Sequence, residues 1–151
     1  MKYLQLMLVG AIALSAALAA QTSANDPIVG TWKLNIGKSK FHPGPAPKSV
    51  TITIAQDGKV TVNETTAEGK DISFSFTPAE ASAVQIEGMD GTTISQRRVD
   101  DHTFEHTWTT GTMTMHGRGV VSADGRTMKY TLTGTRPDGK AVHNSELYEK
   151  Q

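Results

Sequence analysis

The chain has 151 residues, and its 15 basic and 15 acidic side chains give a formal charge of zero near neutral pH. No basic stripe or block of like charge is present, so nucleic acid is not an expected partner. The sequence contains no cysteine, which leaves no disulfide, thiolate metal site or lipid-modified cysteine within it.

The first segment, residues 1–24, has the order of a secretory signal peptide. Lys2 is followed by the apolar stretch "YLQLMLVGAIALSAALAA", and the chain then turns polar at "QTSANDP". This order predicts export, with cleavage after Ala19 or after Ala24. The apolar run is at the short end of what a bilayer span needs. We therefore expect a periplasmic or secreted mature protein that is not integral to the membrane.

Residues 25–151 are enough for one domain, and they alternate short runs of β-forming residues with turns. No stretch repeats apolar residues at helical spacing over a useful length. The turns are marked by six dipeptides: Asp57-Gly58, Glu68-Gly69, Asp90-Gly91, Thr110-Gly111, Asp124-Gly125 and Asp138-Gly139. Such dipeptides suit type I′ turns, in which both central residues have positive φ, so a meander of hairpins is expected.

Each expected strand has one apolar side. In chain order these sides carry Trp32, Leu34 and Ile36; Val50, Ile52 and Ile54; Val60 and Val62; Ile72, Phe74 and Phe76; Val84 and Ile86; Ile94; Phe104 and Trp108; Met113 and Met115; and Met128, Tyr130 and Leu132. A row of such antiparallel strands can close on itself and bury the apolar side. The pattern predicts an all-β, up-and-down antiparallel barrel of about eight to ten strands. A two-sheet sandwich would satisfy the same alternation.

The two ends of the chain carry a family resemblance. The segment "VGTWKLN", residues 29–35, resembles the Gly-x-Trp signature of the lipocalins and the first strand of the fatty-acid-binding proteins, both members of the calycin group of barrels. The segment "NSELYEKQ", residues 144–151, is similar to the last strand of the fatty-acid-binding proteins. The chain as a whole resembles exported bacterial lipocalin-like proteins. The resemblance implies that Trp32 plugs one end of the barrel, under a basic side chain from a late strand.

The last strand departs from this family at one functional position. In the fatty-acid-binding proteins, an arginine and a tyrosine of that strand hold the ligand carboxylate. The resemblance places the tyrosine on Tyr148, but Glu146 stands at the arginine position. A carboxylate there repels the head group of a fatty acid unless a cation or a shifted pKa neutralises it.

The proline-rich segment "GKSKFHPGPAPKS" follows the first expected strand. Family members that enclose fatty acids insert a helical pair at this place. Three prolines, Pro43, Pro45 and Pro47, exclude a continuous helix here, so we expect no helical lid. The segment is either a rim loop with Phe41 over the barrel mouth or a spacer between strands.

Several residues are candidates for binding a ligand inside the barrel. They are Phe104, His106, Trp108, Arg118, Tyr130, Glu146 and Tyr148. Charges inside a small barrel are unfavourable unless they pair, so an inward Glu146 should pair with an arginine. His106 and Tyr148 would then orient a polar ligand. A bulge at Gly117 or Gly119 would instead turn Arg118 to solvent.

No catalytic residue, metal site or cofactor is expected. His102 and His106 would lie on one strand face but about 13 Å apart at roughly 3.3 Å per residue, too far to share one ion. A metal site would need His106 with His116 and a carboxylate. His106 and Glu105 are strand neighbours that point to opposite faces. The sequence also lacks a nucleophile-elbow serine and a glycine-rich phosphate loop.

These observations favour an exported lipocalin-like barrel that binds a small amphipathic or polar-headed molecule in its interior. In the alternative, Met113, Met115, Met128 and the aromatic residues fill the interior, and the barrel is a structural or protein-binding module of the cell envelope. Barrels of about eight strands can be filled or can hold one ligand, so strand number does not separate the two. Nothing in the sequence indicates the oligomeric state.

Overall fold

The computed structural model describes residues 25–151, and the expected signal peptide lies outside them. These residues form ten strands and one short 3₁₀ helix, η1 (Ile36–Lys38). The strands are β1 (Gly30–Leu34), β2 (Ser49–Ile54), β3 (Val60–Thr65), β4 (Asp71–Phe76), β5 (Ala83–Gln85), β6 (Thr92–Asp100), β7 (Thr103–Thr110), β8 (Met113–Val121), β9 (Thr127–Thr135) and β10 (Ala141–Lys150). The described part contains no helix long and apolar enough to cross a membrane.

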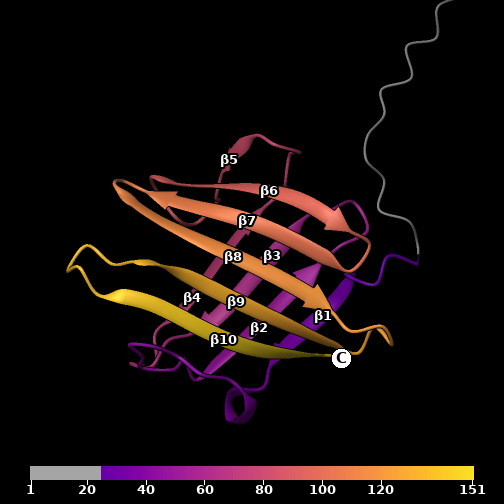
Figure 1. Cartoon of the computed structure of the whole chain (residues 1–151), viewed down its shortest axis with the longest axis horizontal. Coiled ribbons are helices and arrows are strands. Elements are labelled where there is room, and N and C mark those ends of the chain that lie inside the picture. Colours follow the sequence, from indigo (N-terminus) through magenta and orange to yellow (C-terminus); the bar gives the residue numbers. More distant parts are fainter. Residues whose placement is uncertain (1–24) are drawn as a thin grey trace, which may run out of the picture.

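The strands form one antiparallel sheet in the order β4-β3-β2-β1-β10-β9-β8-β7-β6-β5. Each strand therefore pairs with its neighbour in the sequence, except that β1 pairs with β10 and β4 does not pair with β5 as a ladder. The two remaining edges meet where Ser75 and Glu87 exchange backbone hydrogen bonds of 3.0 and 2.8 Å. Figure 1 shows β6–β10 crossing in front of β1–β4. The nearly closed up-and-down barrel is confirmed, and a two-sheet sandwich is not formed.

The predicted alternation describes the inward faces of the strands. Trp32, Ile94 and Met128 are the largest fully buried side chains of the core. One expected inward residue is an exception, because Ile36 is 38% exposed. Strand β1 ends at Leu34, before Ile36. The Asn35 side chain then accepts a hydrogen bond from the Lys38 N–H and caps η1.

The hairpin turns differ from the expected type I′. In four of them the glycine N–H donates to the carbonyl three residues earlier: Gly58 to Ala55, Gly69 to Thr66, Gly125 to Ser122 and Gly139 to Arg136. Among the described residues, Ala81 is the one non-glycine with positive φ, so the acidic residue before each glycine keeps a negative φ. These are three-residue loops in which a type I turn precedes a left-handed glycine. The Asp57 carboxylate supports its turn by accepting from the Lys59 N–H at 3.0 Å.

One end of the barrel is closed around Trp32. This side chain is fully buried, and its Nε1–H donates to the Ile28 carbonyl at 2.8 Å. Lys150, at the end of β10, places its Nζ 4.9 Å from the Trp32 ring centroid and donates to the Pro27 carbonyl at 2.9 Å. The basic side chain over the tryptophan therefore comes from the last strand.

The same end is held by an ion pair between the start of the domain and β6. Two Arg98 nitrogens donate to the two carboxylate oxygens of Asp26, each at 3.0 Å. Burial raises the pKa of Asp26, but the hydrogen bonds from Arg98 and Ile28 outweigh it and leave the pKa below its usual value. The segment before β1 is thus part of the barrel end.

We expect Trp32→Ala to lower the free energy of unfolding by about 3 to 5 kcal/mol, because it removes a fully buried aromatic ring and leaves a void. Urea denaturation monitored by circular dichroism measures this change. The matched control is Lys33→Ala, which changes an exposed neighbour on the same strand and should stay within about 0.5 kcal/mol of the parent. A loss below about 1 kcal/mol for Trp32→Ala would contradict its role as the plug.

Candidate functional site

The barrel encloses a cavity of about 900 Å³. This lies within the roughly 300–1,000 Å³ of pockets that hold small-molecule ligands. One wall is built from β2, β3 and β4 and is apolar apart from Glu64 of β3. Its apolar inward side chains are Val50, Ile52, Ile54, Val60, Val62, Ile72, Phe74 and Phe76. The interior is therefore lined by the predicted apolar faces, which do not fill it.

The opposite wall, from β6 to β10, carries polar side chains near its middle. Strand register sets their arrangement, since Gln96 lies opposite His106 and Tyr130 lies opposite Glu146. Gly117 of β8 lies opposite His106, and a Cβ added there would collide with the Tyr130 hydroxyl and with His106 Nε2. The missing side chain lets these two groups form a hydrogen bond across β8.

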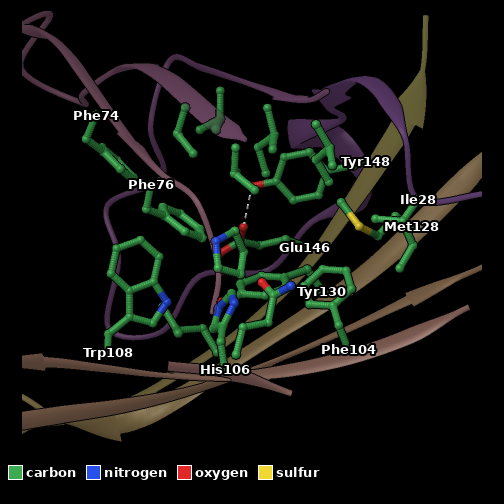
Figure 2. Close-up of a pocket in the computed structure, with 18 of the residues that line it drawn as sticks. Ile28, Phe74, Phe76, Phe104, His106, Trp108, Met128, Tyr130, Glu146 and Tyr148 are labelled. Carbon is green, nitrogen blue, oxygen red and sulfur yellow. Dashed lines mark hydrogen bonds between the residues drawn. The ribbon is translucent and has the colours of Figure 1, made fainter. Parts of the chain in front are cut away.

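Glu146 is the most deeply placed acidic group of the cavity, with 8% of its surface exposed. The Tyr148 hydroxyl donates to Oε2 at 2.8 Å, and the Asn144 amide donates to Oε1 at 3.2 Å (Figure 2). All three residues share one face of β10, because strand side chains alternate with a period of two. The prediction that Glu146 pairs with an arginine is wrong, because both of its partners are neutral hydrogen-bond donors.

The ionisable groups around Glu146 are shifted towards their neutral forms. Burial raises the pKa of Glu146, its two hydrogen bonds offset part of this rise, and the Glu64 carboxylate adds to it. Burial also raises the pKa of Glu64. The pKa values of Tyr130 and Tyr148 are raised above the usual range by burial and by the charge of Glu146.

His106 is neutral at physiological pH. Burial lowers the pKa of His106 from 6.5 to about 4. Its Nε2 contacts Tyr130, but its Nδ1 is buried without a hydrogen-bond partner among residues 25–151. Buried polar atoms in native proteins are nearly always paired, so His106 Nδ1 marks a place where a partner is missing.

Aromatic rings connect the two walls. The Trp108 ring meets Phe74 edge-on, with centroids 5.6 Å apart, and meets Phe76 in the same way at 6.1 Å. Figure 2 shows these three rings gathered on one side of the pocket, with Tyr148 and Met128 on the other. The ring centroids of His106 and Trp108 are 5.5 Å apart. The polar centre of the cavity, formed by His106, Tyr130, Glu146 and Tyr148, therefore lies among aromatic side chains.

The proline-rich segment forms part of the cavity rim. Lys40 and Ser145 exchange backbone hydrogen bonds of 2.7 and 2.8 Å, and the His143 N–H donates to the His42 carbonyl at 2.9 Å, so the segment runs along β10. Phe41 packs against the core, and the cavity lining includes Phe41, Pro45 and Pro47. An extended rim loop stands in place of a helical lid.

Arg118 does not belong to the cavity. It is exposed on the outer face of β8, where it contacts the Glu105 carboxylate. Arg97 binds the other oxygen of the same carboxylate at 2.5 Å. The inward position expected for Arg118 is wrong, because β8 pairs without a bulge and Gly117 and Gly119 take the inward places. Phe104, His106, Trp108, Tyr130, Glu146 and Tyr148 all line the cavity, and their roles towards a ligand stay predictions.

The histidines do not come together at one metal site. His116 lies on the outer face, where its Nδ1 is 3.2 Å from the Thr107 hydroxyl, whereas His106 faces inward. Residues 25–151 contain no group of three or more histidine, aspartate or glutamate side chains placed to hold a metal ion. The Nε2 atom of His106 contacts the Tyr130 hydroxyl rather than Glu146 or Tyr148.

Sequence reasoning missed two groups of the site. Glu64 faces the cavity from β3, and Asn144 holds Glu146 from β10. Glu64 follows Val60 and Val62 at the strand period of two, so alternation alone could have placed it inside. Asn144 precedes Glu146 by the same interval and could have been found in the same way.

Fold and cavity together define a nearly closed up-and-down β-barrel with an open interior. No protein-family model and no curated protein matches the sequence. Solved structures do match the fold. A fatty-acid-binding protein of Schistosoma mansoni in complex with arachidonic acid has a TM-score of 0.56 and 18% identity, covering 87% of this chain and 98% of that one.

Two further solved structures are similar. The fluorescent protein UnaG has a TM-score of 0.51 and 16% identity, covering 82% of this chain and 97% of that one. The ileal bile acid-binding protein of zebrafish, complexed with cholic acid, has a TM-score of 0.50 and 12% identity, covering 83% of this chain and 99% of that one. The calycin resemblance of the two chain ends is thus confirmed as a likeness of fold, and these neighbours include binding proteins for small molecules.

The neutral state of His106 predicts a pH-dependent stability. A pKa lowered from 6.5 to about 4 stabilises the folded protein above about pH 6.5, and this contribution is lost as the pH falls towards 4. The loss between about pH 7 and pH 4 should be about 3 kcal/mol. Urea denaturation across this range measures it for the parent and for His106→Gln.

Other groups also titrate over this range, so the contribution of the histidine is obtained by subtracting the free energy of unfolding of His106→Gln from that of the parent at each pH. This difference in the free energy of unfolding should become smaller as the pH falls. His143→Gln, which changes an exposed histidine on β10, is the matched control and should follow the parent. A His106→Gln curve parallel to the parent curve would show that burial does not hold His106 neutral.

Proposed function

We propose that this protein is an exported carrier or receptor barrel that binds one small amphipathic molecule in its interior. The observation that carries the proposal is a cavity of about 900 Å³ with an unpartnered buried polar atom, His106 Nδ1, in its polar wall. An unpaired buried polar atom costs about 1–3 kcal/mol. A polar group of a ligand would offset that cost, while the wall from β2 to β4 would bury an apolar body.

Two further observations support the proposal. Two of the similar structures are complexes with arachidonic acid and with cholic acid, which supports small-molecule binding within this fold. The signal-like order of residues 1–24 supports export to the periplasm or the medium. A filled structural barrel would need side chains to occupy the interior, and a cavity of this size argues against that alternative.

Native mass spectrometry of protein purified from its native source, before and after organic extraction, tests whether a molecule is carried. We expect a reproducible mass surplus that extraction removes. Binding after extraction can be followed with Nile red, a neutral apolar dye whose fluorescence rises when it enters an apolar cavity. Ile52→Trp, which fills the apolar wall, should weaken Nile red binding by about tenfold or more, as expected for a loss of about 1.4 kcal/mol.

The matched control is Thr53→Trp, which adds the same ring on the exposed side of β2. Circular dichroism checks that both variants fold, and Leu132→Trp provides a second filling variant from the other wall. If the interior is the binding site, Thr53→Trp binds Nile red like the parent and either inward tryptophan weakens binding. A bare mass together with equal binding by all variants would refute the proposed function.

A further inference from the structure

The cavity is acidic although the chain as a whole carries no net charge. The acidic residues that line it are Asp26, Asp57, Glu64, Glu80, Asp101 and Glu146. Among residues 25–151, Arg98 is the one lysine or arginine in that lining. A molecule that enters the interior therefore meets an excess of carboxyl groups.

The nearby cations are already engaged at the plugged end of the barrel. Arg98 binds both oxygens of Asp26 and also donates to the backbone carbonyls of Asp100 and Asp101, each at 2.6 Å. Lys150 lies over the Trp32 ring and donates to a backbone carbonyl. Neither cation contacts Glu64 or Glu146, so the middle of the cavity has no positive charge of its own.

Glu64 and Glu146 have unused hydrogen-bonding capacity. A carboxylate offers about four acceptor sites, and Glu146 uses two of them for the Tyr148 hydroxyl and the Asn144 amide. No hydrogen bond or ion pair to the Glu64 carboxyl is formed within residues 25–151. Burial raises the pKa of both groups, and the charge of Glu64 raises the pKa of Glu146 further. A positive charge would relieve this repulsion.

An independent feature of the wall that carries Glu146 points to a bound molecule. His106 is about nine-tenths buried, with 9% of its surface exposed, and its Nδ1 has no partner in the described part of the chain. Being neutral, it adds no positive charge against a cationic ligand. The rings of Trp108, Tyr130 and Tyr148 surround the same region (Figure 2), and aromatic faces attract cations.

We propose that the cavity takes an amphipathic amine, with its ammonium group at Glu64 and Glu146 and its apolar body against β2, β3 and β4. This inference rests on the proposed function, since it names the class of ligand for the same cavity. The ammonium group supplies N–H donors for the free acceptor sites of the two carboxylates. A carboxylate ligand would instead add a negative charge beside them, in an interior where charges are weakly screened.

Three probes with one chain length separate head-group chemistry from apolar burial. They are dodecylammonium, dodecanol and dodecanoate, titrated below their aggregation limits into the extracted protein at pH 8 and followed by calorimetry. We expect dodecylammonium to bind at least about tenfold more tightly than dodecanoate, with dodecanol between them, because a desolvated charge pair favours the complex by more than about 1.4 kcal/mol.

Variants then locate the preference. Glu146→Gln and Glu64→Gln should each weaken dodecylammonium binding by about fivefold or more while leaving dodecanol within about twofold, because only the charged head loses its partner. The matched control is Glu149→Gln, which removes the same charge from β10 outside the cavity, where Glu149 bonds Asn35 and Lys38. This control should bind all three probes like the parent.

The outcomes are separable. Equal or tighter binding of dodecanoate, or tighter binding of dodecanol than of dodecylammonium, would overturn the amine inference and leave the proposed function standing if Nile red still binds. Unchanged dodecylammonium binding in both inward variants would overturn it as well. If Nile red and all three probes fail to bind, the proposed function itself is refuted.

Discussion

The pairing of β1 with β10 joins the two ends of the domain, and the chemistry of the interior depends on its register. Trp32 lies opposite Lys150, and Leu34 lies opposite Tyr148. This register places Lys150 over the tryptophan and leaves Tyr148 and Glu146 on the inward face. A slip of one residue would reverse every side chain of β10. The burial of Trp32 therefore fixes not only the closure of the barrel but also which groups of the last strand reach the cavity.

The polar centre is compatible with a stable barrel because burial shifts its groups towards their neutral forms in the free protein. Burial lowers the pKa of His106 and raises the pKa values of Glu146, Tyr130 and Tyr148, and each shift disfavours the charged form. Neutral donors, rather than an arginine, hold Glu146. A buried ion pair would have required two desolvated charges. The arrangement keeps one carboxyl group whose ionisation a bound cation would favour.

Alternation predicted the strands and their inward faces, because burying one side of a strand imposes a period of two that the sequence shows directly. The predicted type I′ turn was wrong, since an Asp-Gly pair is compatible with a type I′ turn and also with a type I turn followed by a left-handed glycine. Arg118 was misplaced because the expectation did not follow the alternation that starts at Met113, which puts Gly117 and Gly119 inward and Arg118 outward. The partners of Glu146 are Asn144 and Tyr148, its neighbours on the same face of β10, so alternation could have predicted them; an arginine was expected because a buried charge usually needs a charged partner.

The likeness to binding proteins extends to the fold, while the interior has its own chemistry. The meander of strands depends on alternation rather than on particular side chains, so the fold is shared at 12–18% identity. The head-group chemistry depends on a few inward positions, and at one of them a glutamate stands where the family resemblance implies an arginine. Replacing a cation by a carboxyl group inside an unchanged barrel reverses which ligand charge is favoured. The fold therefore accounts for the presence of a cavity, and in the proposed amine site Glu64 and Glu146 select the charge of the ligand.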